Sequence, residues 1–415
     1  MPARRHLAAL AALLGLAVPA AGLGAPGDAV IVRFAPGVDA TAQAAARAAA
    51  GVRLARPLAL PGAQVVRPAD GEGAGATAAE LEDDPRVAWA EPDAPVAVTR
   101  RTDDPDLGQE WGLLNTGQAV AGRSGTPGAD IGATAAWDLT TGDPSVAVAV
   151  VDTGVDLTHP DLAGAGWVNP GESGGGREAN GRDDDGNGYV DDWRGWDFVQ
   201  RDNDPTNDGH GHGTHVAGTI AARGDDGVGV VGVAFTARLM PLRVLGDSGT
   251  GSISAIADAF AYAGRSGVRV VNASLGWTGG RSRAVADAIA ASPRTLFVVA
   301  AGNAGLDLDA PGTDAWPCEY AAELPNVLCV AATDQRDRLA AFSNRGGMVG
   351  IAAPGVNIRS TLPHGAYGNW QGTSMAAPHV SGAAALVWSL RPDETPAAVR
   401  ADLGHGDRLP ALYGA

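Results

Sequence analysis

Three short motifs place an acid, an imidazole and a hydroxyl where they could act together. Asp152 stands in the segment VDTGVD, His212 opens the segment HGTHVAGT, and Ser374 stands in GTSMAAPHV. Acyl transfer needs a hydroxyl nucleophile, an imidazole that takes and returns its proton, and a carboxylate that orients the imidazole and stabilises its cation. The three residue types therefore predict nucleophilic catalysis by a Ser-His-Asp set.

The three residues lie at the ends of elements that alternate along the chain. We expect strands over 146–151, 239–245, 268–272, 296–301 and 327–332, and helices over 212–222, 252–265, 284–291, 374–390 and 395–403. Most strand runs are continuously apolar, which is typical of a parallel sheet covered on both faces. This pattern predicts a doubly wound, mostly parallel α/β sheet, in which ligands bind beyond the carboxyl ends of the strands.

A smaller α+β domain is expected before this sheet. Strand-like and helical runs alternate over residues 29–34, 41–50, 64–66, 77–81 and 87–90. Their order suggests a ferredoxin-like β-α-β-β-α-β unit. The polar, Pro-containing stretch 98–105 that follows it is where we expect a linker or a processing point.

The first residues have the pattern of an export signal. Arg4 and Arg5 precede the apolar run 7–18, and small residues end the segment. We expect residues 1–25 to be a secretory signal peptide that sends the protein to an extracellular or periplasmic location, with a buried N-terminal helix as the alternative. The apolar run is too short to cross a bilayer, and later apolar stretches are interrupted, so we expect no membrane span.

Composition narrows the class of protein. The formal charge of −17 over 415 residues argues against nucleic-acid binding, which needs a concentrated basic face. With 45% hydrophobic residues the chain can bury a large core, so it is neither fibrous nor disordered. In an exported chain the pair Cys318 and Cys329 favours a disulfide, with two free buried thiols as the alternative. A monomer is the default expectation.

The three motifs and their order along the chain, Asp152, His212 and Ser374, resemble those of the subtilisin-like serine proteases, the subtilase family. The resemblance extends from the leading domain to about residue 403. It implies that Ser374 is the nucleophile, His212 the general base and acid, and Asp152 the carboxylate that orients His212. The implied activity is endopeptidase cleavage of proteins and peptides through an acyl-enzyme.

The resemblance also implies how the substrate is bound. Asn303, in the segment VAAGN, resembles the family's side-chain donor to the oxyanion, and the backbone N–H of Ser374 is the second donor; alone, a Gly-Asn pair would indicate a turn. Two edge segments would pair with the substrate as an extended strand. The implied substrate-binding residues are Ser274, Leu275, Gly276, Gly249, Gly251, Gly302 and Ala315. The pocket for the residue before the scissile bond would have walls at 275–276 and 300–302, with Ala315 near its base. These small, uncharged walls predict that a large apolar residue is accepted there.

Acidic loops predict bound Ca²⁺ rather than zinc, because oxygen-only ligands select hard cations. No organic cofactor is implied. The resemblance suggests one calcium site built from separate segments, at Asp104, Asp161 and Asp226. A further site could use Asp197, Asp202 and Asp204. Ordinary surface acidity is the alternative for this second set.

A third acidic loop matches the first half of an EF-hand. Asp183, Asp185 and Asn187 stand at alternating ligand positions, and Gly188 is sixth in the loop. The twelfth position holds Arg194 instead of the bidentate Glu of an EF-hand. A complete EF-hand is therefore disfavoured, and the choice between a looser calcium site and a solvated acidic loop stays open.

The leading domain, residues 26–101, resembles the family's inhibitory propeptide and chaperone, and residues 102–415 would form the catalytic domain. The resemblance implies that the enzyme cuts its own chain between residues 98 and 102. A folding template is physically reasonable, since a large parallel sheet depends on non-local pairings that form slowly.

Two other classes of function fit the sequence less well. A secreted calcium-binding or adhesive protein would explain the acidic loops but not the motifs at the element ends. An α/β-hydrolase esterase would use the same residue types, but no G-x-S-x-G elbow surrounds Ser374 and the order of the partners differs.

Overall fold

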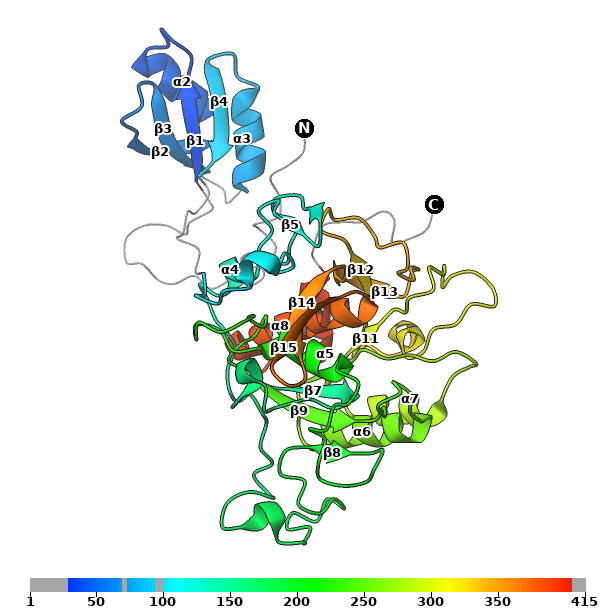
Figure 1. The fold of residues 1–415 in the computed structure, drawn as a ribbon. Helices are drawn as coiled ribbons and strands as arrows, with labels where there is room; N and C mark the ends of the chain where they lie inside the picture. Colours follow the sequence, from blue (N-terminus) through cyan, green and yellow to red (C-terminus); the bar gives the residue numbers. More distant parts are fainter. Residues whose placement is uncertain (1–28, 69–72, 94–100, 405–415) are drawn as a thin grey trace. The chain divides into compact units, whose positions relative to one another are not determined.

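The computed structural model of the chain describes residues 29–68, 73–93 and 101–404 (Figure 1). The chain divides between Val98 and Thr99 into two units, which are described separately. The signal peptide expected at 1–25 lies outside the described residues, and so does most of the expected cleavage region. Within the described residues, no helix has both the length and the apolar character needed to cross a membrane.

The leading unit has the expected β-α-β-β-α-β order. Its elements are β1 (Val30–Phe34), α2 (Ala40–Ala49), β2 (Val52–Pro57), β3 (Ala63–Pro68), α3 (Ala74–Glu82) and β4 (Val87–Pro92). The strands form one antiparallel sheet in the order β2-β3-β1-β4. In β1, the alternate residues Val30, Val32 and Phe34 are buried, so this strand turns one face toward the small core. Strand β2 belongs to this order but was not located in the sequence, because only its first residue is buried.

The larger unit is built on a seven-stranded parallel sheet in the order β13-β12-β11-β10-β7-β9-β8. The strands are β7 (Ala147–Asp152), β8 (Trp196–Asp197), β9 (Arg238–Arg243), β10 (Val270–Ala273), β11 (Leu296–Ala300), β12 (Val327–Thr333) and β13 (Val349–Pro354). This confirms the predicted doubly wound α/β architecture. The two edge strands, β8 and β13, were not predicted, because one is only two residues long and the other is partly exposed.

Helices cover both faces of this sheet (Figure 1). On one face lie α5 (His212–Ala221) and α8 (Thr373–Leu390); on the other lie α6 (Ile253–Arg265) and α7 (Arg283–Ala290). Along β7, Val148 and Val150 belong to the first apolar cluster, whereas Ala149 and Val151 belong to the second. Because both faces are buried, the strand is apolar up to its last residue, Asp152, as the sequence indicated.

Smaller elements complete the larger unit. They are helices α4 (Ala133–Ala136) and α9 (Pro396–Leu403), hairpin strands β5 (Ala119–Val120), β6 (Arg123–Ser124), β14 (Ile358–Leu362) and β15 (Ala366–Trp370), and 3₁₀ turns η1 (Leu107–Gln109), η2 (Pro160–Leu162), η3 (Arg177–Ala179) and η4 (Cys318–Ala322). The predicted disulfide is present: Cys318 in η4 and Cys329 in β12 are joined, and both are fully buried.

The order of the strands marks where a ligand should bind. From β7 the chain continues to β8 and β9, which lie on one side of that strand, and then to β10 on its other side. A crevice opens at such a switch point, beyond the carboxyl ends of the strands. Strand β7 ends at Asp152, and Ser274 directly follows β10, so the fold brings these two residues to the same crevice.

Candidate active site

Asp152 and His212 form a hydrogen-bonded pair at this crevice. The imidazole Nδ1 of His212 lies 2.7 Å from Asp152 Oδ1, and the same oxygen accepts a hydrogen bond from the backbone N–H of Thr153 at 2.8 Å. Asp152 is completely buried, whereas the His212 side chain retains 17% of its exposure. The carboxylate can therefore fix the imidazole tautomer with a proton on Nδ1, leaving Nε2 as the base.

The surroundings of His212 favour its charged form. Burial alone lowers the pKa of the imidazole, but the charge and hydrogen bond of Asp152, together with the charge of Asp208, outweigh that effect and raise it. The imidazole is thus a stronger base than an isolated histidine.

Asp208 anchors the start of the helix that carries His212, a role that the sequence did not reveal. Its Oδ1 accepts from Gly211 N at 2.7 Å and from Thr153 Oγ1 at 2.8 Å; its Oδ2 accepts from the N–H and hydroxyl of Thr214, at 2.9 and 2.6 Å. A buried carboxylate just before a helix stabilises the free N–H groups of the first turn. Its place four residues before His212 was the only signal of this role in the sequence.

The other two histidines near His212 have different surroundings. His215 is fully buried, its Nε2 lies 3.0 Å from Ile358 O, and its ring stacks on Trp370 at 5.2 Å. Burial lowers the pKa of His215 to about 3, so its ring is neutral. His210 is exposed, and its ring lies 6.1 Å from that of His212. Trp370, which the sequence did not single out, also lies 6.0 Å from the His212 ring.

Ser374 lies in the first turn of α8. Its hydroxyl donates to the backbone oxygen of Ser274 at 3.2 Å, and no hydrogen bond joins it to His212 within the part of the chain described. Contacts between a nucleophile and its base are often long or misaligned before substrate binds. The backbone N–H of Ser374 belongs to the turn whose N–H groups have no partner within the helix, so it is available to an anion.

A proline inside α8 ties Ser374 to the end of β10. Pro378 has no N–H, so the carbonyl of Ser374, four residues earlier, lacks its helical partner. The hydroxyl of Ser274 donates to that carbonyl at 2.8 Å. Asn272 Nδ2 in turn donates to the Ser274 hydroxyl at 3.0 Å, and Ser381 donates to Asn272 Oδ1 at 2.8 Å. This chain of hydrogen bonds holds the start of α8 against the sheet.

Asn303 follows β11 and turns its amide toward the start of α8. Its Oδ1 accepts from the N–H of Thr373 at 2.8 Å and from the Thr373 hydroxyl at 3.0 Å. A backbone N–H can only donate, so this contact defines which amide atom is the oxygen. The Nδ2 group consequently remains free, near Gly372, where a Cβ would lie 3.4 Å from it. The amide can therefore donate to a substrate oxygen close to Ser374.

The two expected substrate edges flank this site. After β9, residues 245–251 form a tight turn in which Leu245 pairs with Gly251, and a Cβ on Gly251 would lie 2.0 Å from Val244 O. After β10, the segment Ser274, Leu275 and Gly276 leads to Trp277. Gly249 has a φ of +71°, a conformation that favours glycine.

The walls expected for the pocket lie next to each other. Gly302 has a φ of +98°, and a Cβ built on it would lie 3.9 Å from Ala315 Cβ. A Cβ on Gly276 would lie 3.0 Å from Trp316 O. Trp277 and Trp316 exchange two backbone hydrogen bonds, of 2.8 and 3.0 Å, which join the two walls. Neither tryptophan was identified from the sequence.

Asp104, Asp161 and Asp226 are brought into one region by the fold. Asp104 and Asp161 are buried, and one carboxylate oxygen of each, Oδ1, has no hydrogen-bond partner. Burial is the main cause that raises the pKa of Asp161 to about 6, and the charges of Asp226 and Asp104 raise it further. Burial likewise raises the pKa of Asp104. Orphaned buried carboxylate oxygens are a feature that a cation would satisfy.

The second proposed calcium site, at Asp197, Asp202 and Asp204, has no buried carboxylate oxygen without a partner among the described residues. Both oxygens of Asp197 are occupied: Oδ2 pairs with Arg243 Nη1 at 2.5 Å, and Oδ1 accepts from the N–H groups of Val199 and Gln200. Asp202 and Asp204 accept hydrogen bonds within their own turns. Asp197 is thus an ion-pair partner of Arg243, which the sequence could not reveal, and the ligand role expected for Asp197, Asp202 and Asp204 stays a prediction.

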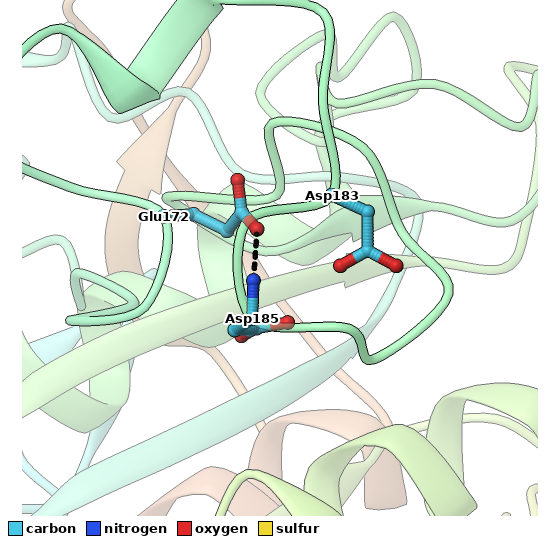
Figure 2. A group of neighbouring side chains, drawn as sticks. All are labelled: Glu172, Asp183 and Asp185. Carbon is cyan, nitrogen blue, oxygen red and sulfur yellow. Dashed lines mark hydrogen bonds between the residues drawn. The ribbon is translucent and has the colours of Figure 1, made fainter.

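Asp183 and Asp185 do lie together, in a cluster whose third member the sequence missed. Within residues 29–68, 73–93 and 101–404, the one group of three possible ligand residues with oxygens all within 4.8 Å of one another comprises Glu172, Asp183 and Asp185 (Figure 2). The side chain of Asn187 donates through Nδ2 to Asp185 Oδ2 at 3.2 Å and to Asp192 Oδ2 at 2.8 Å.

The larger unit is similar to known subtilases in both sequence and fold. The model of the Subtilase family matches residues 143–406. A solved structure described as a cold adapted subtilisin-like serine proteinase is 30% identical, with a TM-score of 0.51, over 70% of this chain and 89% of that one.

Several named relatives are similar over most of the chain. The alkaline protease of Shouchella clausii is 38% identical over 317 residues, 75% of this chain and 66% of the relative. Subtilisin Savinase of Lederbergia lenta is 42% identical over 60% of this chain and 77% of the relative. Thermitase of Thermoactinomyces vulgaris is 40% identical over 61% of this chain and 78% of the relative.

Proposed function

Since the chain belongs to the subtilase family, we propose that its larger unit is a serine endopeptidase that hydrolyses peptide bonds of proteins through an acyl-enzyme. The proposal is supported most directly by one observation: a buried carboxylate, Asp152, is hydrogen-bonded to His212 at the crevice that also contains Ser374. Acyl transfer requires these three groups in these roles.

The proposed reaction begins with proton transfer. His212 Nε2 takes the hydroxyl proton of Ser374 while the Ser374 oxygen attacks the scissile carbonyl, and Asp152 stabilises the resulting imidazolium. His212 then donates this proton to the leaving amine, and the acyl group remains on Ser374. A water molecule, deprotonated by the same imidazole, hydrolyses the ester and restores the serine.

Charge that develops on the substrate oxygen needs donors that are in place beforehand. Asn303 Nδ2, held by the contacts of its Oδ1 with Thr373, is one proposed donor, and the backbone N–H of Ser374 is the other. Both groups have no partner within the described residues, so neither must give up a hydrogen bond when the tetrahedral intermediate forms. The positive end of α8 favours the same negative charge.

Peptide substrates are proposed to bind as an extended strand between the two edges. Main-chain hydrogen bonds to 274–276 and 249–251 would bind many sequences, and the pocket beside Gly302 and Ala315 would select the residue before the scissile bond. The pocket walls named here carry no charged side chain, so a large apolar residue is expected there. Strict cleavage after Arg in a peptide library would contradict this assignment.

Calcium is proposed to stabilise the larger unit. The donors at Asp104, Asp161 and Asp226 fit a hard cation, since two buried oxygens lack partners. Bound Ca²⁺ would neutralise these carboxylates and link segments that are far apart in the chain. In Ser374→Ala protein, which cannot digest itself, excess chelator should lower the unfolding temperature. An unchanged temperature would contradict a structural calcium ion.

The leading unit is proposed to be an inhibitory propeptide that the enzyme removes, and residues 1–25 a signal peptide for export. The leading unit has the β-α-β-β-α-β order that its pattern of strand-like and helical runs predicted. Ser374→Ala protein should then remain uncleaved near residues 98–102 on purification, as judged by its mass and N-terminal sequence. Maturation of the pure variant would disprove self-processing.

Cleavage of casein by the wild type and by Ser374→Ala tests the proposed activity against the alternative of a non-catalytic, calcium-binding secreted protein. The proposal predicts cleavage by the wild type and none by the variant above the trace that the other groups support. Equal behaviour of the two proteins would favour the alternative.

A further inference from the structure

We propose that Glu172 completes a calcium site with the loop that begins at Asp183. The site would be separate from the one proposed at Asp104 and Asp161, and it would be formed by a segment that precedes the loop. It uses no catalytic residue, so it does not rest on the proposed protease activity.

The first observation is the placement of three carboxylates. Oxygens of Glu172, Asp183 and Asp185 all lie within 4.8 Å of one another, and Figure 2 shows the three side chains around one space. Calcium binds oxygen at 2.3–2.6 Å, so two ligands on opposite sides of one ion are about 4.6–5.2 Å apart. The cluster therefore fits a single Ca²⁺.

The second observation is an unpaired oxygen on a fully buried side chain. Glu172 has no exposed surface, and its Oε1 accepts hydrogen bonds from the N–H groups of Asp184 and Asp185, at 2.5 and 3.0 Å. Its carboxylate is thus directed toward the loop. The other oxygen, Oε2, is equally buried and has no partner among the described residues. A buried charged oxygen without a partner is destabilising unless a cation or water binds it.

The comparison with an EF-hand gives Glu172 its chemical role. An EF-hand loop places a bidentate Glu at its twelfth position, and Arg194 occupies that position here. The Arg194 guanidinium lies over the Trp193 ring, 4.2 Å from its centroid. Glu172 supplies a carboxylate to the same loop from the N-terminal side. The ligand that the loop lacks in sequence is therefore provided by the fold.

The cluster is also linked to the core of the larger unit. Asn169 Nδ2 donates both to Asp185 Oδ2 at 2.9 Å and to Asp192 Oδ1 at 2.8 Å. Asp192 is buried, and its Oδ2 accepts from the hydroxyl of Tyr262, in α6, at 2.6 Å. A cation bound by Asp185 would consequently stabilise a long loop, residues 169–192, through contacts with a core helix. This would protect the loop from local opening and from proteolysis.

Calcium stoichiometry tests the site directly. The test uses full-length Ser374→Ala protein, freed of metal and titrated with Ca²⁺ in a calorimeter, with Mg²⁺ as a comparison. Glu172→Gln keeps the shape of the side chain but removes its charge. Asp184→Asn is the matched control, because it removes one charge from the same loop but lies outside the cluster.

The proposal predicts that Glu172→Gln binds one Ca²⁺ fewer than its parent, or binds it at least 10-fold more weakly, whereas Asp184→Asn binds as many ions as the parent. Asp161→Asn should lose a different ion, which separates this site from the other proposed calcium site. If Glu172→Gln does not fold by circular dichroism, Asp185→Asn replaces it. Unchanged stoichiometry and affinity in the folded variant would overturn the site.

Discussion

The hydrogen bond from Ser274 to the carbonyl of Ser374 leads to a prediction about both stability and catalysis. Pro378 leaves that carbonyl without its helical donor, and the Ser274 hydroxyl replaces it at 2.8 Å. In Ser274→Ala the carbonyl of Ser374 and the buried amide of Asn272 both lose their partner. An unsatisfied buried polar group costs about 1–3 kcal/mol, and two groups lose their partner, so we expect a loss of stability of about 2–6 kcal/mol.

The same substitution should also slow the reaction. The first turn of α8 carries both the nucleophile and one oxyanion donor, and the Ser274 hydroxyl holds this turn against β10. A displacement approaching 1 Å in such a constellation can lower the rate by about 10²-fold, so a decrease in kcat of about 10- to 10²-fold is expected. KM should change little, because the backbone of residues 274–276 remains.

Ser381→Ala is a matched control. It removes the other hydrogen bond of the Asn272 amide, that to Oδ1 at 2.8 Å, but Ser381 lies further along α8 and has no hydrogen bond to Ser374. Stability would be compared by thermal unfolding of both variants in the Ser374→Ala background, where self-digestion is absent. The kcat and KM values would be measured on a peptide substrate in the otherwise unchanged enzyme, after titration of active sites.

Ser274→Ala should lose about twice as much stability as Ser381→Ala, because it leaves two buried groups without a partner instead of one. Only Ser274→Ala should lose kcat. If both retain the wild-type kcat, the hydrogen bond to the Ser374 carbonyl does not position the nucleophile, and the role assigned to Pro378 is wrong.

Two further predictions concern the groups around His212 and Asn303, and a third concerns the disulfide. His212 is protonated and inactive as a base below its raised pKa, so kcat/KM should fall as the pH decreases through that pKa. Asp208→Asn removes a negative charge near His212 and should shift this fall in kcat/KM to lower pH. A shift to higher pH would contradict the role assigned to Asp208. Asn303→Ala should reduce kcat by about 10²–10³-fold, the decrease measured for loss of the equivalent donor in subtilisin itself, and should change KM little. An unchanged kcat would show that Asn303 does not donate to the oxyanion. Replacing both Cys318 and Cys329 by Ala removes a disulfide that joins residues 11 apart in the sequence, and it should lower the free energy of unfolding by about 3 kcal/mol. An unchanged unfolding temperature would show that the disulfide does not stabilise the protein.

Sequence patterns predicted the features that are local in the chain. Continuous apolar runs identified the central strands, because a strand buried on both faces shows its burial directly in its residues. The motifs around Asp152, His212 and Ser374 indicated the chemistry, and the structure places the first two in hydrogen-bond contact. The two-residue strand β8 and the partly polar hairpin β14–β15 carried no such pattern, so they were missed.

Features that depend on contacts between distant segments were not predictable in this way. Asp197 stands in an acidic stretch, and nothing in the local sequence indicates that its carboxylate pairs with Arg243, 46 residues later. Glu172 was overlooked because it precedes its loop, and Asp208 because its four hydrogen bonds involve Thr153 and a helix start. In each case the role is determined by a partner that the local sequence does not contain.

The proposed role of Ser374 as the nucleophile is the central claim, and covalent labelling tests it most directly. The mature enzyme would be treated with a serine-directed phosphonate or sulfonyl fluoride, digested, and analysed by mass spectrometry to locate the label. The label is expected on Ser374, at a rate that falls sharply in His212→Ala. A label on another residue, or labelling of Ser374 that is equally fast without His212, would contradict the proposed mechanism.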